Sequence, residues 1–360
     1  MKTFAYNIIF LVFLVVVLEL IFGNWLQTDR LNRLNLVKDT QIVYQLNDLY
    51  EAEYDSVVYT RDEYGFRGDY PDVSSIDILT IGGSTTDQRY ITDNQTWQHV
   101  LQKEFRDNGY DISVVNAGVD GQTTIGHTKN FEWWFPLIPE LKVRYYLFFI
   151  GINDFYVNEN SSYDELLKSD EEGFATRVKI LLSSKSAIYN LMRTVKNISK
   201  ARKLNVGHNH VLEFKYTDQP LLENHDAIMK NRLEAYGKRL SYLLEKVNLS
   251  GSRSIVVTQS MRRAYNTTSS NTVIGIDDTL GVMDSISFNG VDYYYMAKLM
   301  NEKTMEVCSQ YNGICIDMDS ELDFDIEADF YDRMHNTPAG ADKIGKYLYN
   351  NLKDILFRER

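Results

Sequence analysis

The 360-residue chain has little cysteine and little proline. Its two cysteines, Cys308 and Cys315, are too few for a disulfide framework. They could pair in an oxidising compartment, or they could be two small buried thiols. Only 5 prolines and 20 glycines occur, which argues against long disordered linkers. We therefore expect one large domain with insertions.

Positive charge is also scarce. The chain has 38 lysines and arginines against 50 aspartates and glutamates, which gives a net charge of −12. No strongly basic cluster offsets this balance. A surface of this kind disfavours general binding to nucleic acid or to anionic lipid, so we expect no nucleic-acid partner.

Patterns that bind metals are missing as well. His208 and His210 have no set of cysteines or carboxylates near them at ligand spacing, which predicts an exposed polar loop. Eight carboxylates lie between Asp317 and Asp332, but the glycine and glutamate of an EF-hand loop are absent at the required positions. We expect a solvated acidic loop there and no metal or organic cofactor.

One long apolar run lies near the amino terminus. Residues 8–22 are apolar except for Glu19, and with the next four residues the run reaches the ~20 residues that a membrane-spanning helix needs. No small-residue cleavage site follows, so residues 1–26 are predicted to form an uncleaved signal anchor. The alternative is a buried amphipathic helix. A long downstream domain translocates largely regardless of flanking charge, which predicts that residues 27–360 lie outside the cytoplasm.

Apolar runs alternate with amphipathic helical patterns from residue 76 onward. The runs are rich in valine, isoleucine, tyrosine and phenylalanine, which is typical of strands buried on both faces of a parallel sheet. The alternation predicts a doubly wound, flavodoxin-like α/β fold, with a mainly five-stranded parallel sheet and helices on both faces. The predicted strands are 76–82, 112–117, 143–150, 253–259 and 314–318, and the predicted helices are 94–107, 123–135, 225–247, 288–311 and 338–356.

Three segments do not follow this alternation. Residues 27–75 are predicted to be a juxtamembrane segment, helical over about 28–53 and then extended. Residues 156–224 and 260–287 are predicted insertions in the catalytic domain, which spans 76–360. Both insertions are expected above the carboxyl edge of the sheet, where such folds bind their ligands.

Four short motifs follow predicted strands, at the point where each strand ends. Because the carboxyl ends of parallel strands meet at one edge of a sheet, we expect the motifs to lie together. Each motif alone is an ordinary turn or loop, but their occurrence at successive strand ends indicates a site. They are Gly-Gly-Ser at 82–84, Asn-Ala-Gly-Val-Asp-Gly at 116–121, Gly-Ile-Asn-Asp at 151–154 and Asp-Arg-Met-His at 332–335.

The residues of these motifs suit nucleophilic catalysis. Ser84 is the candidate nucleophile and His335 its candidate general base. Asp332, three residues earlier, can orient the imidazole. An attacked carbonyl oxygen becomes negative, and the N–H groups of Ser84 and Gly121 with the amide of Asn153 are candidate donors to it.

The order of the four motifs resembles the four blocks of the SGNH, or GDSL-type, hydrolases. The resemblance implies that the serine, histidine and aspartate form a catalytic triad, and that Gly121 and Asn153 complete the oxyanion hole, with Gly118 as the alternative to Gly121. The family's usual first block is Gly-Asp-Ser, whereas this chain has Gly83, a variant familiar among membrane-anchored members. The Gly-Phe-Arg-Gly segment at 65–68 also resembles a stretch of anchored bacterial members.

The resemblance implies a serine esterase that works through an acyl-enzyme without a cofactor. Anchoring and family analogy suggest an O-acyl substrate, most simply O-acetyl, on an extracytoplasmic glycan. One alternative is an O-acyltransferase that uses the same residues with a multi-span membrane partner. The other is a catalytically silent glycan-binding or scaffold protein. An α/β-hydrolase is disfavoured, because Ser84 does not lie in a Gly-x-Ser-x-Gly elbow.

Overall fold

A computed structural model of the chain divides into two units, residues 1–36 with 165–207 and residues 37–164 with 208–360. The structure describes residues 2–23, 25, 31, 34–46, 49–156, 164, 166, 178, 182, 185–189, 191–192, 215–260, 264–267, 272–277, 281–283, 286–325, 327–332 and 334–358.

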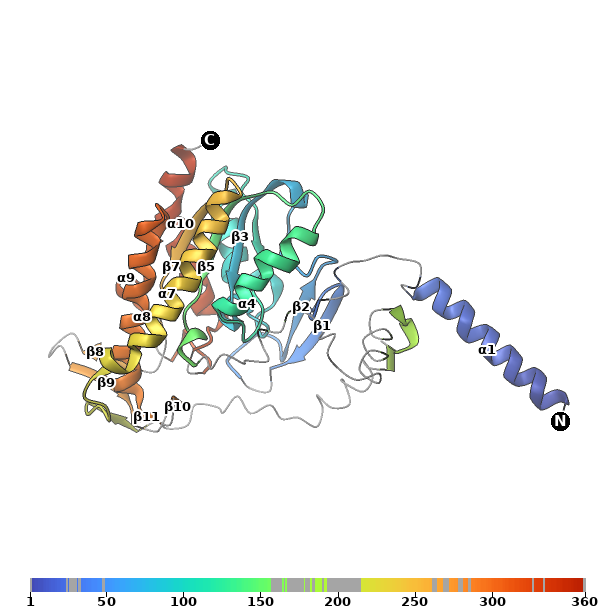
Figure 1. The fold of residues 1–360 in the computed structure, drawn as a ribbon, viewed down its shortest axis with the longest axis horizontal. Helices are drawn as coiled ribbons and strands as arrows, with labels where there is room; N and C mark the ends of the chain where they lie inside the picture. The colour runs from blue at the N-terminus through green and yellow to red at the C-terminus, as the bar shows by residue number, and fades with distance from the viewer. Residues whose placement is uncertain are drawn as a thin grey trace. The chain divides into compact units, whose positions relative to one another are not determined.

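The larger unit is built on a five-stranded parallel sheet in the order β4-β3-β5-β7-β12 (Figure 1). Numbered along the chain, this order is 2-1-3-4-5, and the direction of winding reverses between the first and third of these strands. The predicted parallel sheet is therefore confirmed. The strands are β3 (Ile76–Gly82), β4 (Val114–Asn116), β5 (Val143–Phe149), β7 (Arg253–Val257) and β12 (Ile314–Ile316).

Helices cover both faces of this sheet, as the alternation predicts (Figure 1). On one face α3 (Trp97–Asp107) packs against α10 (Pro338–Arg358). On the other, α7 (His225–Leu249) contacts both α4 (Thr124–Lys129) and α8 (Gly290–Gln310). A disulfide joins Cys308 of α8 to Cys315 of β12, which decides between the two alternatives for the cysteines.

Alternate residues of β5 show why the strands of this sheet are mostly apolar. Tyr145, Leu147 and Phe149 belong to the core that α3 and α10 close. Tyr146 and Phe148, between them, lie against the Phe131 ring on the opposite face. Because both faces of the strand are buried beyond Arg144, each later position takes an aromatic or aliphatic side chain.

The segment before the sheet contains a strand where the sequence predicted a helix. β1 (Thr40–Gln45) pairs antiparallel with β2 (Ser56–Arg61). The prediction of a helix over 28–53 is therefore wrong for these residues. The side chains of β1 alternate between half-buried and exposed. The β-branched and aromatic residues at the centre of β1 favour a strand.

The described part of the 260–287 insertion consists of short strands. Two of them, β8 and β9, form a sheet in the order β6-β9-β8 with β6 of the 156–224 insertion, and β10 and β11 form a hairpin. The helical patterns expected within 156–224 lie largely outside the described residues. The strands are β6 (Tyr216–Thr217), β8 (Ala264–Thr267), β9 (Thr272–Ile276), β10 (Gly281–Met283) and β11 (Ile286–Phe288).

The smaller unit contains the amino-terminal helix α1 (Lys2–Phe22). Glu19 interrupts the apolar run of this helix, and its carboxylate accepts hydrogen bonds from the Trp25 indole and the Ser186 hydroxyl. Within the part of the chain that is described, no helix has both the length and the apolarity to cross a membrane. The predicted transmembrane helix over residues 1–26 is therefore not borne out.

Candidate active site

The turn that carries Ser84 joins β3 to the short helix α2 (Ser84–Asp87). Gly82 is the last residue of the strand, and a Cβ there would lie 2.5 Å from the Phe149 carbonyl oxygen. A Cβ at Gly83 would lie 2.2 Å from Asn153 Nδ2. Both glycines are therefore required by close approach of neighbouring groups, which places Ser84 directly beside the third motif.

The predicted triad residues lie within hydrogen-bond distance of one another. Ser84 Oγ is 2.7 Å from His335 Nε2, across 251 residues of sequence. His335 Nδ1 is 2.7 Å from Asp332 Oδ2. With Asp332 ionised, it accepts the Nδ1 proton, and the lone pair on Nε2 faces the serine hydroxyl. This is the arrangement in which a histidine takes a proton from a nucleophile.

The loop that carries the histidine is held from three sides. Asp332 Oδ1 accepts hydrogen bonds from the N–H groups of Met334 and His335, each at 2.8 Å. The Tyr331 ring stacks on the imidazole, with 5.5 Å between the ring centres and 9° between the planes. The Tyr331 N–H also donates to the His335 carbonyl oxygen at 3.0 Å. These contacts fix the position and the plane of the imidazole.

Asn153, one of the candidate oxyanion donors, lies against the turn that carries Ser84. Asn153 Nδ2 donates to the Gln122 carbonyl oxygen at 2.8 Å, which ties the third motif to the second. Gly121 has φ +75°, a conformation that favours glycine. Among the described residues, no acceptor takes the N–H of Ser84 or of Gly121. Both N–H groups are therefore available to a substrate oxygen.

Gly118, the alternative to Gly121, is engaged elsewhere. Its N–H donates to Asn116 Oδ1 at 2.8 Å, and a Cβ on it would lie 2.5 Å from the Asp87 backbone nitrogen. It therefore serves the packing of the second motif against α2, and the geometry favours Gly121 as the donor.

Sequence reasoning missed Gln259, which follows β7. Its Oε1 accepts from the Ile152 N–H at 2.9 Å, and its Nε2 donates to Thr85 Oγ1 at 2.9 Å. The side chain is buried and links the third motif to the residue after Ser84. A signal was present, because Gln259 is a polar residue at the end of the one strand to which no motif was assigned.

The third motif ends in a buried carboxylate. Asp154 accepts hydrogen bonds from the Thr124 N–H at 3.0 Å and from Arg239 Nη2 at 3.1 Å. Burial raises the pKa of Asp154 although Thr124 and Arg239 oppose the shift. No group of three metal-binding side chains is found among the residues that the structure describes.

The chain has a parallel sheet of order 2-1-3-4-5, and a hydrogen-bonded Ser-His-Asp triad lies at the carboxyl edge of this sheet. These two features are those of an α/β hydrolytic enzyme with a serine nucleophile. The model of the GDSL-like lipase/acylhydrolase family matches residues 78–348, a range that contains all four motifs. The chain therefore belongs to this family and is an ester-bond hydrolase. A search of curated proteins found no match.

The solved structures to which the chain is similar include two esterases and TesA. Axe2, an acetylxylan esterase from Geobacillus stearothermophilus, is 13% identical, with 77% of this chain and 94% of that chain covered and a TM-score of 0.42. The esterase EstA from Pseudoalteromonas sp. is 11% identical, with 78% and 99% covered and a TM-score of 0.40. TesA is 13% identical, with 77% and 98% covered and a TM-score of 0.41.

Proposed function

We propose that this chain is a serine esterase that removes an O-acyl group, most simply O-acetyl, from a glycan outside the cytoplasm. One observation carries the proposal, the continuous hydrogen-bonded chain from Ser84 through His335 to Asp332. These three residues come from two distant parts of the sequence, and the fold brings them together at the carboxyl edge of the sheet.

The reaction follows from this geometry in two steps. His335 Nε2 takes the proton of Ser84 as Oγ attacks the ester carbonyl carbon, and the oxygen that becomes negative accepts hydrogen bonds from Ser84, Gly121 and Asn153. The intermediate collapses when His335 protonates the leaving alcohol, which forms the acyl-enzyme. Water then attacks the acyl group with His335 again as base, and Ser84 regains its proton.

The exposure of the site supports a small acyl group on a bulky carrier. The side chains of His335 and Asp332 keep 19% and 18% of their surface exposed. An ester on a polymer can reach a nucleophile that lies this close to the surface. A long acyl chain would require an enclosed apolar pocket beside the serine.

The disulfide supports the proposed location of the catalytic domain. Disulfides persist in oxidising compartments and are rare in the cytosol. Cys308 and Cys315 are paired with 6.0 Å between their Cα atoms. This pairing agrees with a domain that lies in the periplasm or at the cell surface.

The proposal is tested with the purified full chain on p-nitrophenyl acetate, on a long-chain p-nitrophenyl ester and on O-acetylated oligosaccharides. We expect acetate release, with the long-chain ester a poor substrate. His335→Ala should abolish turnover, and His99→Ala, a half-buried histidine on α3, should not. Transfer of acetyl to an added oligosaccharide faster than to water would contradict hydrolysis. Equal activity of the two histidine variants would contradict the mechanism.

A further inference from the structure

The arginine at the end of β2 uses every hydrogen-bond donor that it has. The five N–H groups of a guanidinium lie in one plane and point in fixed directions. Arg61 is buried, and its Nε donates to the Tyr59 hydroxyl at 2.8 Å. Nη1 donates to the carbonyl oxygens of Gly65 and Asn116, at 2.9 and 3.1 Å. Nη2 donates to Asp87 Oδ1 and to the Gly118 carbonyl oxygen.

Asp87, the acidic partner of Arg61, ends the helix that begins at Ser84. Its side chain is only 2% exposed, and its Oδ1 also accepts from the Tyr59 hydroxyl at 2.8 Å. The Asp87 N–H donates to the Gly83 carbonyl oxygen at 2.9 Å. The position of Asp87 is therefore coupled rigidly to the position of Ser84 through one turn of helix.

Arg61 also donates to two carbonyl oxygens of the second motif. Asn116 ends β4, and Gly118 lies on the loop that leads from it to Gly121; Nη2 reaches the Gly118 carbonyl oxygen at 2.7 Å. Asn116 Nδ2 adds a direct link to the helix, because it donates to the Thr86 carbonyl oxygen at 2.6 Å. Arg61 therefore bridges the helix of the nucleophile and the loop of the second oxyanion donor.

We infer that Arg61 is a positioning residue of the active site, because its guanidinium fixes the spacing between the N–H groups of Ser84 and Gly121. The inference rests on the proposed roles of those two residues. The planar guanidinium of Arg61 holds the Asp87 carboxylate and the Gly118 carbonyl oxygen at fixed distances from each other. A lysine ammonium has three donors on a single atom and cannot reach all five acceptors.

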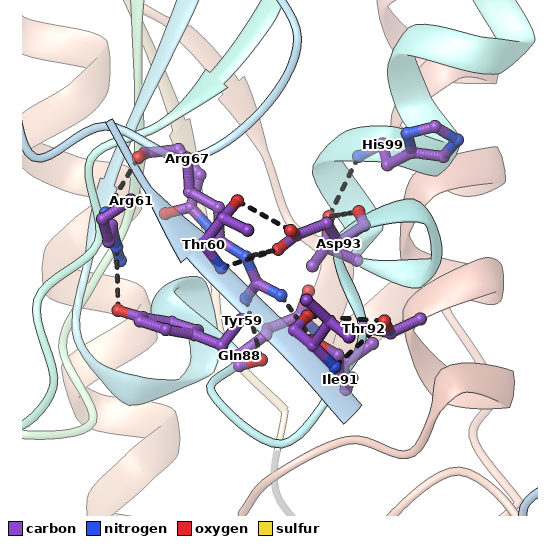
Figure 2. Close-up of polar contacts among 12 residues, drawn as sticks. Tyr59, Thr60, Arg61, Arg67, Gln88, Ile91, Thr92, Asp93 and His99 are labelled. Carbon is purple, nitrogen blue, oxygen red and sulfur yellow. Dashed lines mark hydrogen bonds and ion pairs between the residues drawn. The ribbon is translucent and has the colours of Figure 1, made fainter. Parts of the chain in front are cut away.

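Arg67 lies in the Gly-Phe-Arg-Gly segment and provides the matched control. Figure 2 shows Arg61 beside Tyr59, and Arg67 between Ile91 and Asp93. Arg67 is equally buried and donates to the Asp87 and Gln88 carbonyl oxygens, at 2.7 and 3.0 Å. Within the part of the chain that the structure describes, its guanidinium donates no hydrogen bond to residues 116–121. The Arg67 backbone pairs with Asn116 through two hydrogen bonds, at 2.9 and 2.8 Å, and a lysine at this position keeps them. The two guanidinium groups therefore differ in whether they join α2 to the loop of the second motif.

The test compares Arg61→Lys with Arg67→Lys in the full chain, on p-nitrophenyl acetate, at a temperature where both variants are folded by circular dichroism. Acylation and deacylation both pass through an oxyanion, so a misplaced donor slows both. A displacement of 1 Å can cost about 10²-fold in rate. We expect kcat to fall about 100-fold in Arg61→Lys with KM changed less than about 3-fold, and kcat in Arg67→Lys to stay within about 3-fold of the parent.

Equal losses of kcat in the two variants would overturn the inference, because they would show a general structural role. Full kcat in Arg61→Lys would also overturn it. If Arg61→Lys does not fold, Asp87→Asn tests the same bridge from the other side and should show the same fall in kcat. Ser84→Ala separates a failure of the proposed function from a failure of the proposed role of Arg61. Activity in Ser84→Ala contradicts the proposed function itself, whereas an inactive Ser84→Ala beside a fully active Arg61→Lys contradicts only the role of Arg61.

Discussion

Alanine at Gly83 is a small change that should disable the oxyanion hole. An added Cβ would lie 2.2 Å from Asn153 Nδ2 and 3.3 Å from the Gln122 carbonyl oxygen. Ordinary van der Waals contact begins at 3.4 Å, so the amide must move by at least about 1 Å. Asn153 would then lose its place beside Ser84 and its 2.8 Å hydrogen bond to Gln122.

The size of the effect follows from the loss of one donor. Removing a single oxyanion donor lowers kcat by about 10²–10³-fold, which is about 2.7–4 kcal/mol of transition-state stabilisation. We expect Gly83→Ala to lose kcat by that factor on p-nitrophenyl acetate. Asn153→Ala should lose the same factor. The double variant should lose no more than either single variant, because both remove the same interaction.

Gly237→Ala is the control for the added methyl group. Gly237 lies in α7, and the nearest neighbour of a Cβ there is the flexible Lys303 side chain, at 3.2 Å, with Val307 at 3.7 Å. This variant should keep kcat and gain stability of up to about 1 kcal/mol from helix propensity. Full activity in Gly83→Ala would refute the placement of Asn153, and additive losses in the double variant would refute its coupling to Gly83.

Three further predictions concern the triad, a buried carboxylate and the disulfide. Asp332→Asn should lower kcat about 10⁴-fold in a folded protein, because it removes the acceptor that sets the His335 tautomer, and a loss under 10-fold would contradict this. Burial disfavours the charge of Asp87, but neighbouring arginines outweigh it and hold its pKa below the ordinary value of an aspartate carboxyl group. Its stabilising effect is therefore full above that value and is lost as pH falls through the lower folded pKa, so urea unfolding should show an acid limb that flattens in Asp87→Asn. Cys308→Ser with Cys315→Ser opens a loop of sequence separation 7 and should lower the free energy of unfolding by about 2.5 kcal/mol in urea titrations, whereas no change would contradict the pairing.

The sheet could be predicted because its strands are buried on both faces. β3 occupies the predicted range 76–82, and β5 ends one residue before the predicted limit of 150. Continuous apolar runs of this length, separated by helical patterns, leave few other folds. Because each motif follows a strand of a parallel sheet, the motifs could be assigned to the carboxyl edge of that sheet before any contact was known.

β1 could not be predicted in the same way because one face of its strand is half-buried and the other is exposed. Its sequence has polar residues at both ends, and its burial alternates with every residue. Three apolar residues in a polar stretch fit a short strand and a weakly amphipathic helix equally well. Only its pairing with β2, across a connection of ten residues, decides between them.

The triad was accessible from sequence, whereas the residues that position it were not. Ser84, Asp332 and His335 occur in motifs whose chemistry is recognisable from residue type. Arg61 is a charged residue that usually lies at the surface. Its burial depends on Asp87 and on carbonyl oxygens more than fifty residues away, which the sequence does not bring together by any periodic pattern.

Labelling with a fluorophosphonate probe tests the central claim most directly. The full chain is treated with the probe, digested and analysed by mass spectrometry, beside Ser84→Ala and a known serine esterase. We expect one adduct, on the peptide that contains Ser84, and none in the variant. An unlabelled Ser84, under conditions that label the known esterase, would contradict the proposal that this serine is the nucleophile.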